Sequence, residues 1–60
     1  MKPTTIIRAI LRDYPSTRYD ETDAYLIHLK QIFSGSISIE SPIKISTFLR
    51  IWQRYRRSTN

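Results

Sequence analysis

One stretch near the C-terminus constrains the fold more than any other: residues 41–57, which read SPIKISTFLRIWQRYRR. If each residue turns a helix by about 100°, the large apolar and aromatic side chains of this stretch share one arc of about 160°. These side chains belong to Ile45, Phe48, Leu49, Ile51, Trp52 and Tyr55. The opposite side carries Thr47, Arg50, Arg54 and Arg57. A helix with one apolar face must bury that face against other elements, so we expect the rest of the chain to support it.

The first residue of this helix is ambiguous from the sequence. A start at Ser41 would place Pro42 at the first helical position, directly after a serine cap. A start at Ser46 would use that serine as the cap and leave the preceding residues as a separate short turn. We favour the later start, with the main helix over residues 46–57.

The net charge of +5 sits entirely in the last third of the chain. Residues 1–40 contain five basic and five acidic groups, which cancel. Residues 41–60 contain no acid and five basic residues, namely Lys44, Arg50, Arg54, Arg56 and Arg57. A concentrated positive patch attracts polyanions, of which nucleic acid is the commonest. The alternative is a charged surface that only keeps the protein soluble, with cations placed favourably at a helix C-terminus.

Length and composition restrict the class of protein. Sixty residues allow one domain, residues 1–60, with one small core. The chain has no cysteine, which excludes a disulfide or a thiolate metal site. No apolar run reaches the roughly 20 residues that span a bilayer, and arginines interrupt the N-terminal segment too early for a signal peptide. We therefore expect a cytoplasmic protein with no membrane partner. Because so small a core gives little stability, we also expect a homodimer.

Residues 4–14 predict a first helix. Its apolar side chains share one arc, and they belong to Ile6, Ile7, Ile10, Leu11 and Tyr14. Thr4 or Thr5 can cap its start. Pro15 ends it, because the residue before a proline is driven out of the helical conformation. Arg8 and Arg12 lie one turn apart on the other side, where they could extend a basic surface, although exposure to solvent is the simplest expectation.

A second helix is predicted to begin at Asp20, with Asp23 three residues later in a variant of the capping box. Its core face is predicted from apolar residues at i, i+1, i+4, i+7 and i+8. These are Tyr25, Leu26, Leu29, Ile32 and Phe33. Ile27 falls outside this face, so we expect it to be exposed and available for a dimer contact.

The second helix is predicted to end at Ser34-Gly35, with glycine in the left-handed conformation that commonly follows a helix. Residues 36–40, SISIE, alternate polar and apolar side chains. Since a lone strand would have no partner here, we expect an ordered loop with Ile37 and Ile39 on the core.

No residue pattern indicates catalysis or metal binding. Asp20, Glu21 and Asp23 lack the ligand spacing of a calcium-binding loop, and helix capping explains them. His28, the single histidine, lies at the edge of the predicted core face without a nucleophile or a second ligand nearby in sequence. We therefore expect no enzymatic activity, no catalytic residue, no metal and no cofactor.

The segment LRDYPSTRYDETDAYLIHLKQIF resembles small uncharacterised, helix-turn-helix-like proteins of phages and prophages of Gram-positive bacteria. They carry a D-Y-P-x-T-R-x-D-D segment, which this chain matches at Asp13, Tyr14, Pro15, Thr17, Arg18, Asp20 and Glu21. Their last helix has the form S-x-[ST]-[IV]-x-R-x-x-Q-K, which is matched at Thr47, Phe48, Arg50, Gln53 and Arg54. Trp52 stands where those proteins have a second arginine. The resemblance implies a phage origin and a helix-turn-helix-like build, and it carries no established activity.

These observations predict an all-α, helix-turn-helix-like domain of three helices, with a short ordered loop before the last helix. Helix-turn-helix domains present one helix to base edges and place arginines on phosphates. We predict nucleic-acid binding, with DNA favoured over RNA, through Lys44, Thr47, Arg50, Arg54, Arg56 and Arg57. Trp52 and Tyr55 are expected in the core and not on bases. The alternative is a protein–protein interaction module, such as a phage-encoded inhibitor of a host nucleic-acid-handling enzyme.

Overall fold

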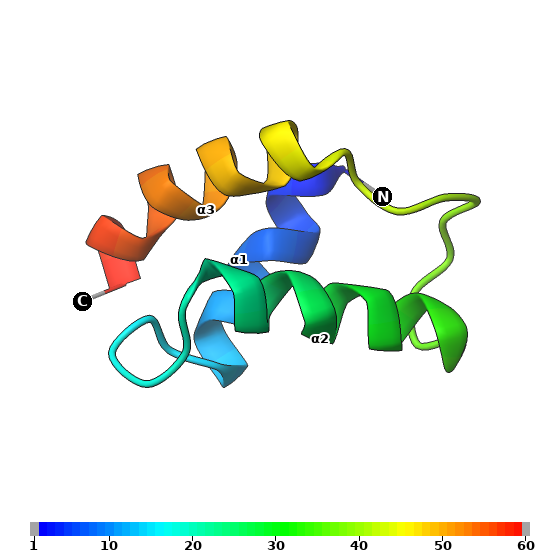
Figure 1. Cartoon of the computed structure of the whole chain (residues 1–60), viewed down its shortest axis with the longest axis horizontal. Coiled ribbons are helices and arrows are strands. Elements are labelled where there is room, and N and C mark those ends of the chain that lie inside the picture. The colour runs from blue at the N-terminus through cyan, green and yellow to red at the C-terminus, as the bar shows by residue number, and fades with distance from the viewer. Residues whose placement is uncertain (1, 60) are drawn as a thin grey trace.

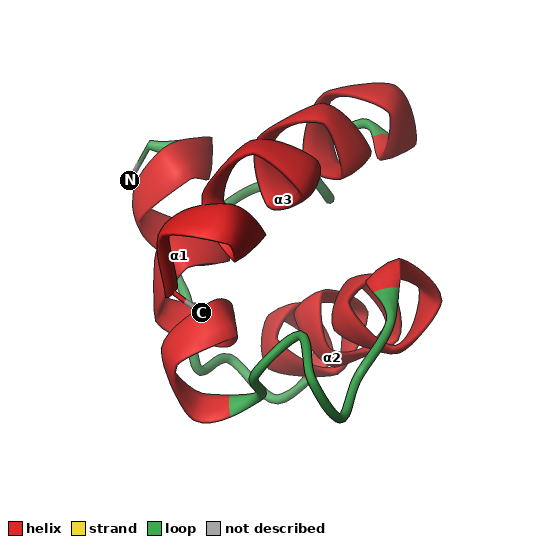
Figure 2. Ribbon diagram, turned by 90° about the vertical axis from the view of Figure 1, so that its left-hand side faces the viewer, coloured by secondary structure: helices red, strands yellow, loops and turns green. Residues whose placement is uncertain are grey.

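A computed structural model describes the backbone of residues 2–59 and the side chains of residues 2–57. The described residues form three helices, α1 (Pro3–Asp13), α2 (Glu21–Phe33) and α3 (Ile45–Thr59), and no strand. Figure 1 shows α2 and α3 running in opposite directions, with α1 crossing both at a steep angle. Figure 2 shows α1 on the left, with α3 at the upper right and α2 at the lower right. The prediction of an all-α domain of three helices is confirmed.

The start of α1 is set by Pro3, not by a threonine cap. Pro3 occupies the first helical position and Lys2 precedes it, without a side-chain hydrogen bond to the helix end. Proline suits this position because its N–H would have no helical partner and its φ is already helical. The predicted capping by Thr4 or Thr5 is therefore wrong. The helix ends at Asp13, one residue before the predicted end at Tyr14.

Both ends of α2 follow the sequence prediction. The Asp20 carboxylate accepts from the Asp23 backbone N–H at 2.9 Å, and the Asp23 carboxylate accepts from the Asp20 N–H at 3.2 Å, which completes a capping box. At the other end, Gly35 has φ of 76°. The N–H groups of Gly35 and Ser36 donate to the carbonyl groups of Ile32 and Gln31 at 3.1 and 2.9 Å. These two bonds form a Schellman motif, which satisfies carbonyls that the helix leaves without partners.

The core lies mainly between α1 and α3. Its buried apolar residues are Ile6, Ile7, Ile10 and Leu11 from α1, Ala24 from α2, Ile43 from the connection, and Phe48 and Trp52 from α3. The predicted apolar faces of the first and last helices are thus confirmed, although Leu49 is only half-buried and Ile45 is 56% exposed. Burying each large apolar side chain stabilises the fold by roughly 1.5–3 kcal/mol.

The predicted core face of α2 is wrong at Leu26 and Phe33, while Tyr25, Leu29 and Ile32 are half-buried. Leu26 is 52% exposed and Phe33 is 94% exposed, whereas Ala24 and His28 are fully buried. Ile27 was expected in solvent, but it is half-buried and packs on the core. Because successive residues lie about 100° apart around a helix, the buried pair Ala24 and His28 lies about 120° from the centre of the predicted face, and the helix is rotated by about a third of a turn.

Two hydrogen bonds to Ile43 explain this rotation. The Ile43 backbone N–H donates to His28 Nε2 at 3.0 Å, and the Tyr25 hydroxyl donates to the Ile43 carbonyl oxygen at 2.7 Å. Both side chains must face the connection between α2 and α3 to make these bonds. Buried backbone groups need such partners, so the two bonds outweigh a somewhat better apolar stripe on the other side of α2.

The connection between α2 and α3, residues 34–44, is ordered by contacts with the core. Ile37 and Ile39 are half-buried against the core, as predicted. The helix α3 begins at Ile45, one residue before the favoured start, and the alternative start at Ser41 is wrong. This connection is much longer than the three- to four-residue turn that joins the two helices of a helix-turn-helix pair. No helix in the described part of the chain is long and apolar enough to cross a membrane.

Candidate nucleic-acid interface

Three of the predicted site residues form one cationic face on α3. Arg50, Arg54 and Arg57 are all exposed, and they follow one another at i, i+4 and i+7. This spacing places them on one side of the helix, over roughly 10 Å of its axis. None of the three forms an ion pair within the described residues. The side chains of this face are therefore available to an anionic partner.

The structure adds an arginine from α1 to this surface. The Cζ atom of Arg8 lies 5.6 Å from the centre of the Tyr55 ring, and Cζ of Arg54 lies 5.9 Å from the same ring. Tyr55 is half-buried at the boundary between α1 and α3. A guanidinium within about 6 Å of an aromatic ring is attracted by its negative face. The ring therefore holds Arg8 near the cationic face of α3.

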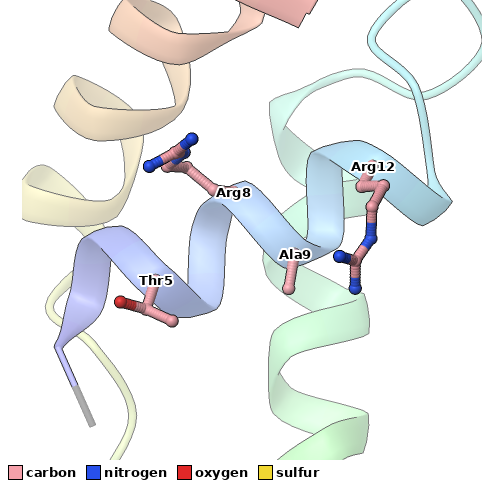
Figure 3. Close-up of a pocket in the computed structure, with 4 residues that line it drawn as sticks. All are labelled: Thr5, Arg8, Ala9 and Arg12. Atoms are coloured by element: carbon pink, nitrogen blue, oxygen red, sulfur yellow. The ribbon is translucent and has the colours of Figure 1, made fainter.

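The predicted site did not include Arg8, although the sequence allowed it to extend a basic surface. Its spacing from Arg12 showed only that both lie on the outer face of a helix, where arginines are usually just solvated. Figure 3 shows Arg8 and Arg12 in a shallow hollow with Thr5 and Ala9, with the Arg8 guanidinium directed toward α3 and that of Arg12 pointing away. Arg12 lies 3.7 Å from the Asp13 carboxylate. Of these two arginines, only Arg8 therefore extends the arginine surface of α3. Its position depends on the way in which α1 crosses α3.

Arg56, another predicted site residue, packs on the core. It is half-buried, and its Cζ lies 5.3 Å from the centre of the Trp52 ring. Trp52 itself is 1% exposed. The stem and guanidinium of Arg56 thus cover the largest buried side chain of the domain. The packing prediction for Trp52 is confirmed, and Arg56 is half-buried whereas Arg50, Arg54 and Arg57 are exposed.

Lys44 and Thr47 lie at the opposite end of α3 from Arg57. They line a shallow hollow with Glu40 and the start of α1. Thr47 is half-buried, and Lys44 is exposed. Because a carboxylate shares this hollow, the potential here is less positive than along the arginine face. The structure therefore separates the predicted site into an arginine face and a mixed-charge end.

The buried histidine has a structural role in this geometry. His28 Nε2 accepts a hydrogen bond from the Ile43 backbone N–H, so in the neutral ring Nδ1 carries the proton, and Nδ1 is buried without a partner among the described residues. Burial lowers the pKa of His28 below its ordinary value because a charged ring loses its hydration. The neutral form is the one that can accept from Ile43. In the described part of the chain, no group of three or more histidine, cysteine or acidic side chains is placed to hold a metal ion.

Comparison with known proteins adds no relative. No protein-family model matches the chain, and neither a curated protein nor a solved structure is significantly similar to it.

Proposed function

We propose that this protein binds nucleic acid through the arginine face of α3, extended by Arg8 of α1. The observation that carries the proposal is the exposed set Arg50, Arg54 and Arg57 on one side of a helix that has no acidic residue. About 10 Å of DNA duplex carries roughly six phosphate charges. An arginine face of this length can therefore contact several phosphates at once, and guanidinium groups bind phosphate oxygens in bidentate geometry.

The placement of acidic residues supports the same proposal. Glu21 and Asp23 lie in the first turn of α2, and Asp20 caps that helix. Asp13 pairs with Arg12 at the end of α1. None of these carboxylates forms an ion pair with the arginine face. The positive potential of the face is therefore not cancelled locally, which favours long-range attraction of a polyanion.

Binding to a DNA duplex as a function of salt tests the proposal. Three to five phosphate contacts give a log–log slope of about −3 to −4.5, since each contact releases roughly 0.9 counterion. Arg54→Ala should weaken binding to all sequences alike and make the slope shallower by about one. Arg54→Lys should retain most of the slope, because the charge remains. Fluorescence anisotropy with labelled duplex DNA and a matched single-stranded RNA measures both quantities and shows which polymer is preferred.

Arg12→Ala is the matched control for this experiment. Arg12 is also exposed but lies beside Asp13 and points away from α3, so its loss should leave the salt slope unchanged. Absence of affinity for DNA and RNA at low salt, with circular dichroism showing a folded protein, would contradict the proposal. An Arg12→Ala effect as large as that of Arg54→Ala would instead indicate non-specific attraction by net charge alone.

The competing function is a protein–protein interaction in which the same arginine face meets an acidic protein surface. A cytoplasmic, phage-encoded inhibitor of a host nucleic-acid-handling enzyme fits this description, and the resemblance to small phage and prophage proteins supports that setting. The two functions differ in one measurable respect. The inhibitor should show little affinity for nucleic acid at physiological salt, while Arg54→Ala still abolishes its binding to the host protein.

A further inference from the structure

The ring of Tyr55 brings together two arginines from different helices. The Cζ atoms of Arg8 and Arg54 lie 5.6 and 5.9 Å from the centre of this one ring. Arg8 belongs to α1 and Arg54 to α3, and both side chains are exposed. Tyr55 itself is half-buried and packs on the core. A ring that is anchored in the core thus keeps two exposed cations near each other where α1 crosses α3.

The two side chains approach the ring from opposite helices. Figure 3 shows the Arg8 guanidinium extending from α1 toward α3. On α3, Arg54 lies about 100° around the helix from Tyr55, whereas Arg50 and Arg57 lie roughly 140–160° from it. Of the three arginines on this face, Arg54 is therefore the one directed most toward α1.

Acidic side chains do not neutralise this pair of cations. Within the described residues, neither Arg8 nor Arg54 forms an ion pair with a carboxylate, whereas Arg12 lies 3.7 Å from Asp13. Two positive charges held near one ring repel each other. An anionic group bound between them relieves this repulsion and accepts charge-assisted hydrogen bonds from both guanidinium groups.

The chemistry of two guanidinium groups favours a phosphate as that anion. Each guanidinium presents its N–H groups in a planar fork, which matches two oxygens at N···O distances of about 2.7–2.9 Å. One fork is enough to match a flat carboxylate. The tetrahedral arrangement of phosphate oxygens instead allows contacts from two directions at once, as two arginines on separate helices require.

A packing role explains these two arginines less well than it explains Arg56. The Cζ atom of Arg56 lies 5.3 Å from the centre of the Trp52 ring, and Arg56 is half-buried over that side chain. Arg8 and Arg54 are exposed, on a ring that is itself only half-buried. Their guanidinium N–H groups are therefore accessible to a ligand.

We propose that Arg8, Arg54 and Tyr55 form a phosphate-binding site at the crossing of α1 and α3. The two arginines contact the phosphate oxygens, and Tyr55 is a positioning residue that holds both of them through its ring. The identity of the ligand rests on the proposed function, since in a nucleic acid the bound group is one phosphate of the backbone. Free phosphate offers the same chemistry, and separate measurements with DNA and with inorganic phosphate distinguish the two sources.

Anisotropy titrations with labelled duplex DNA test the contribution of Arg8. Arg8→Ala should make the log–log salt slope shallower by about one and weaken binding at about 0.1 M salt by about five- to tenfold, because one phosphate contact is lost. Arg12→Ala, one turn further along the exposed side of α1, is the matched control and should change neither quantity. If Arg8→Ala behaves like Arg12→Ala while Arg54→Ala still weakens binding, the two-helix site is wrong and the arginine face of α3 acts alone.

Two substitutions of Tyr55 test its positioning role. Tyr55→Phe keeps the aromatic ring and should retain the wild-type salt slope. Tyr55→Leu keeps an apolar side chain but removes the ring, so the further loss of affinity caused by Arg8→Ala should shrink to less than about twofold in this background. The comparison is made at a temperature at which circular dichroism shows all variants to be folded. An Arg8→Ala loss that is equally large with leucine and with tyrosine at this position would show that the ring does not position Arg8.

Titration with inorganic phosphate tests the site without nucleic acid. In NMR spectra, the side-chain Nε–H signals of Arg8 and Arg54 should shift together with one dissociation constant, while the signal of Arg12 stays unchanged. The same shifts in a protein that binds neither DNA nor RNA would support the site and contradict the proposed function. Equal shifts of all three arginines would overturn the site, because they indicate only a general attraction between the anion and positive charge.

Discussion

Trp52 shows how much of the stability of this domain depends on single side chains. It is among the largest fully buried residues, and it lies between the α1 core and the covering guanidinium of Arg56. Its indole Nε1 is buried without a hydrogen-bond partner among the described residues. The residue therefore contributes through apolar packing and not through its polar atom, at some cost for the unpaired N–H.

Replacing Trp52 by alanine should unfold the protein. Loss of a buried aromatic side chain costs about 3–5 kcal/mol, because both the transfer energy and the filled volume are lost. A domain of this size rarely has more than about that amount of stability. Thermal melting followed by circular dichroism measures the effect, with Gln53→Ala, an exposed neighbour on α3, as the control. An unchanged melting curve for Trp52→Ala would show that α3 does not pack on α1 as described.

Helix α2 shows that the ends of an element and its rotation have different causes. Its start depends on the reciprocal bonds of Asp20 and Asp23, and its end depends on Gly35. Both signals are local and readable from sequence. Its rotation instead depends on Tyr25 and His28, which bind a backbone group more than a dozen positions away. Apolar spacing contains no information about that distant partner.

Removing the α2 cap should cause a moderate loss of stability. Asp20→Ala deletes the acceptor for the Asp23 N–H and should lower the free energy of unfolding by about 1 kcal/mol, within a range of roughly 0.5–2 kcal/mol. Asp20→Asn should cost much less, because asparagine retains an acceptor and is an equally good cap. Urea denaturation compares the variants. Equal losses for the two substitutions would contradict the capping role and point to the charge of Asp20 instead.

At the scale of the whole molecule, the attachment of α2 to the core of α1 and α3 involves one titratable side chain, that of His28. The closest packing joins α1 and α3, while α2 contributes Ala24, His28 and the bonds to Ile43. Protonation of His28 at Nε2 would remove the acceptor for the Ile43 N–H. The attachment of α2 therefore requires the neutral imidazole.

Stability should fall as the pH decreases below about 6.5, the ordinary histidine pKa. The folded state lowers the pKa of His28, so in this range the unfolded chain binds more protons than the folded one. The stabilising contribution is complete above the unfolded pKa and is lost as the pH falls toward the folded pKa. The slope reaches at most about 1.4 kcal/mol per pH unit. Urea denaturation at pH values above the range of carboxylate titration measures it.

His28→Gln separates this effect from other titrations. Glutamine keeps a side-chain acceptor but does not titrate near neutral pH, so the variant should be less stable overall and lose the slope below pH 6.5. A slope that persists in His28→Gln would have to come from another group, since His28 is the single histidine of the chain.

The sequence alone determined the helices and the charge distribution. Pro15, Asp20 and Gly35 mark the ends of the elements through local backbone chemistry. The apolar arcs of α1 and α3 identified their buried faces, because each of these helices has a single apolar side. The sequence likewise showed that Arg50 and Arg54 share one exposed face.

Only the tertiary structure decided which side of α2 is buried and which arginines act together. Two faces of α2 are apolar enough to pack, and long-range hydrogen bonds from Tyr25 and His28 to Ile43 select between them. That selection exposes Leu26, which lines a shallow apolar hollow with Ile45 and Leu49 of α3. Arg8 joins the α3 surface for a similar reason, since its neighbour Tyr55 is distant in sequence and meets it only when the two helices cross.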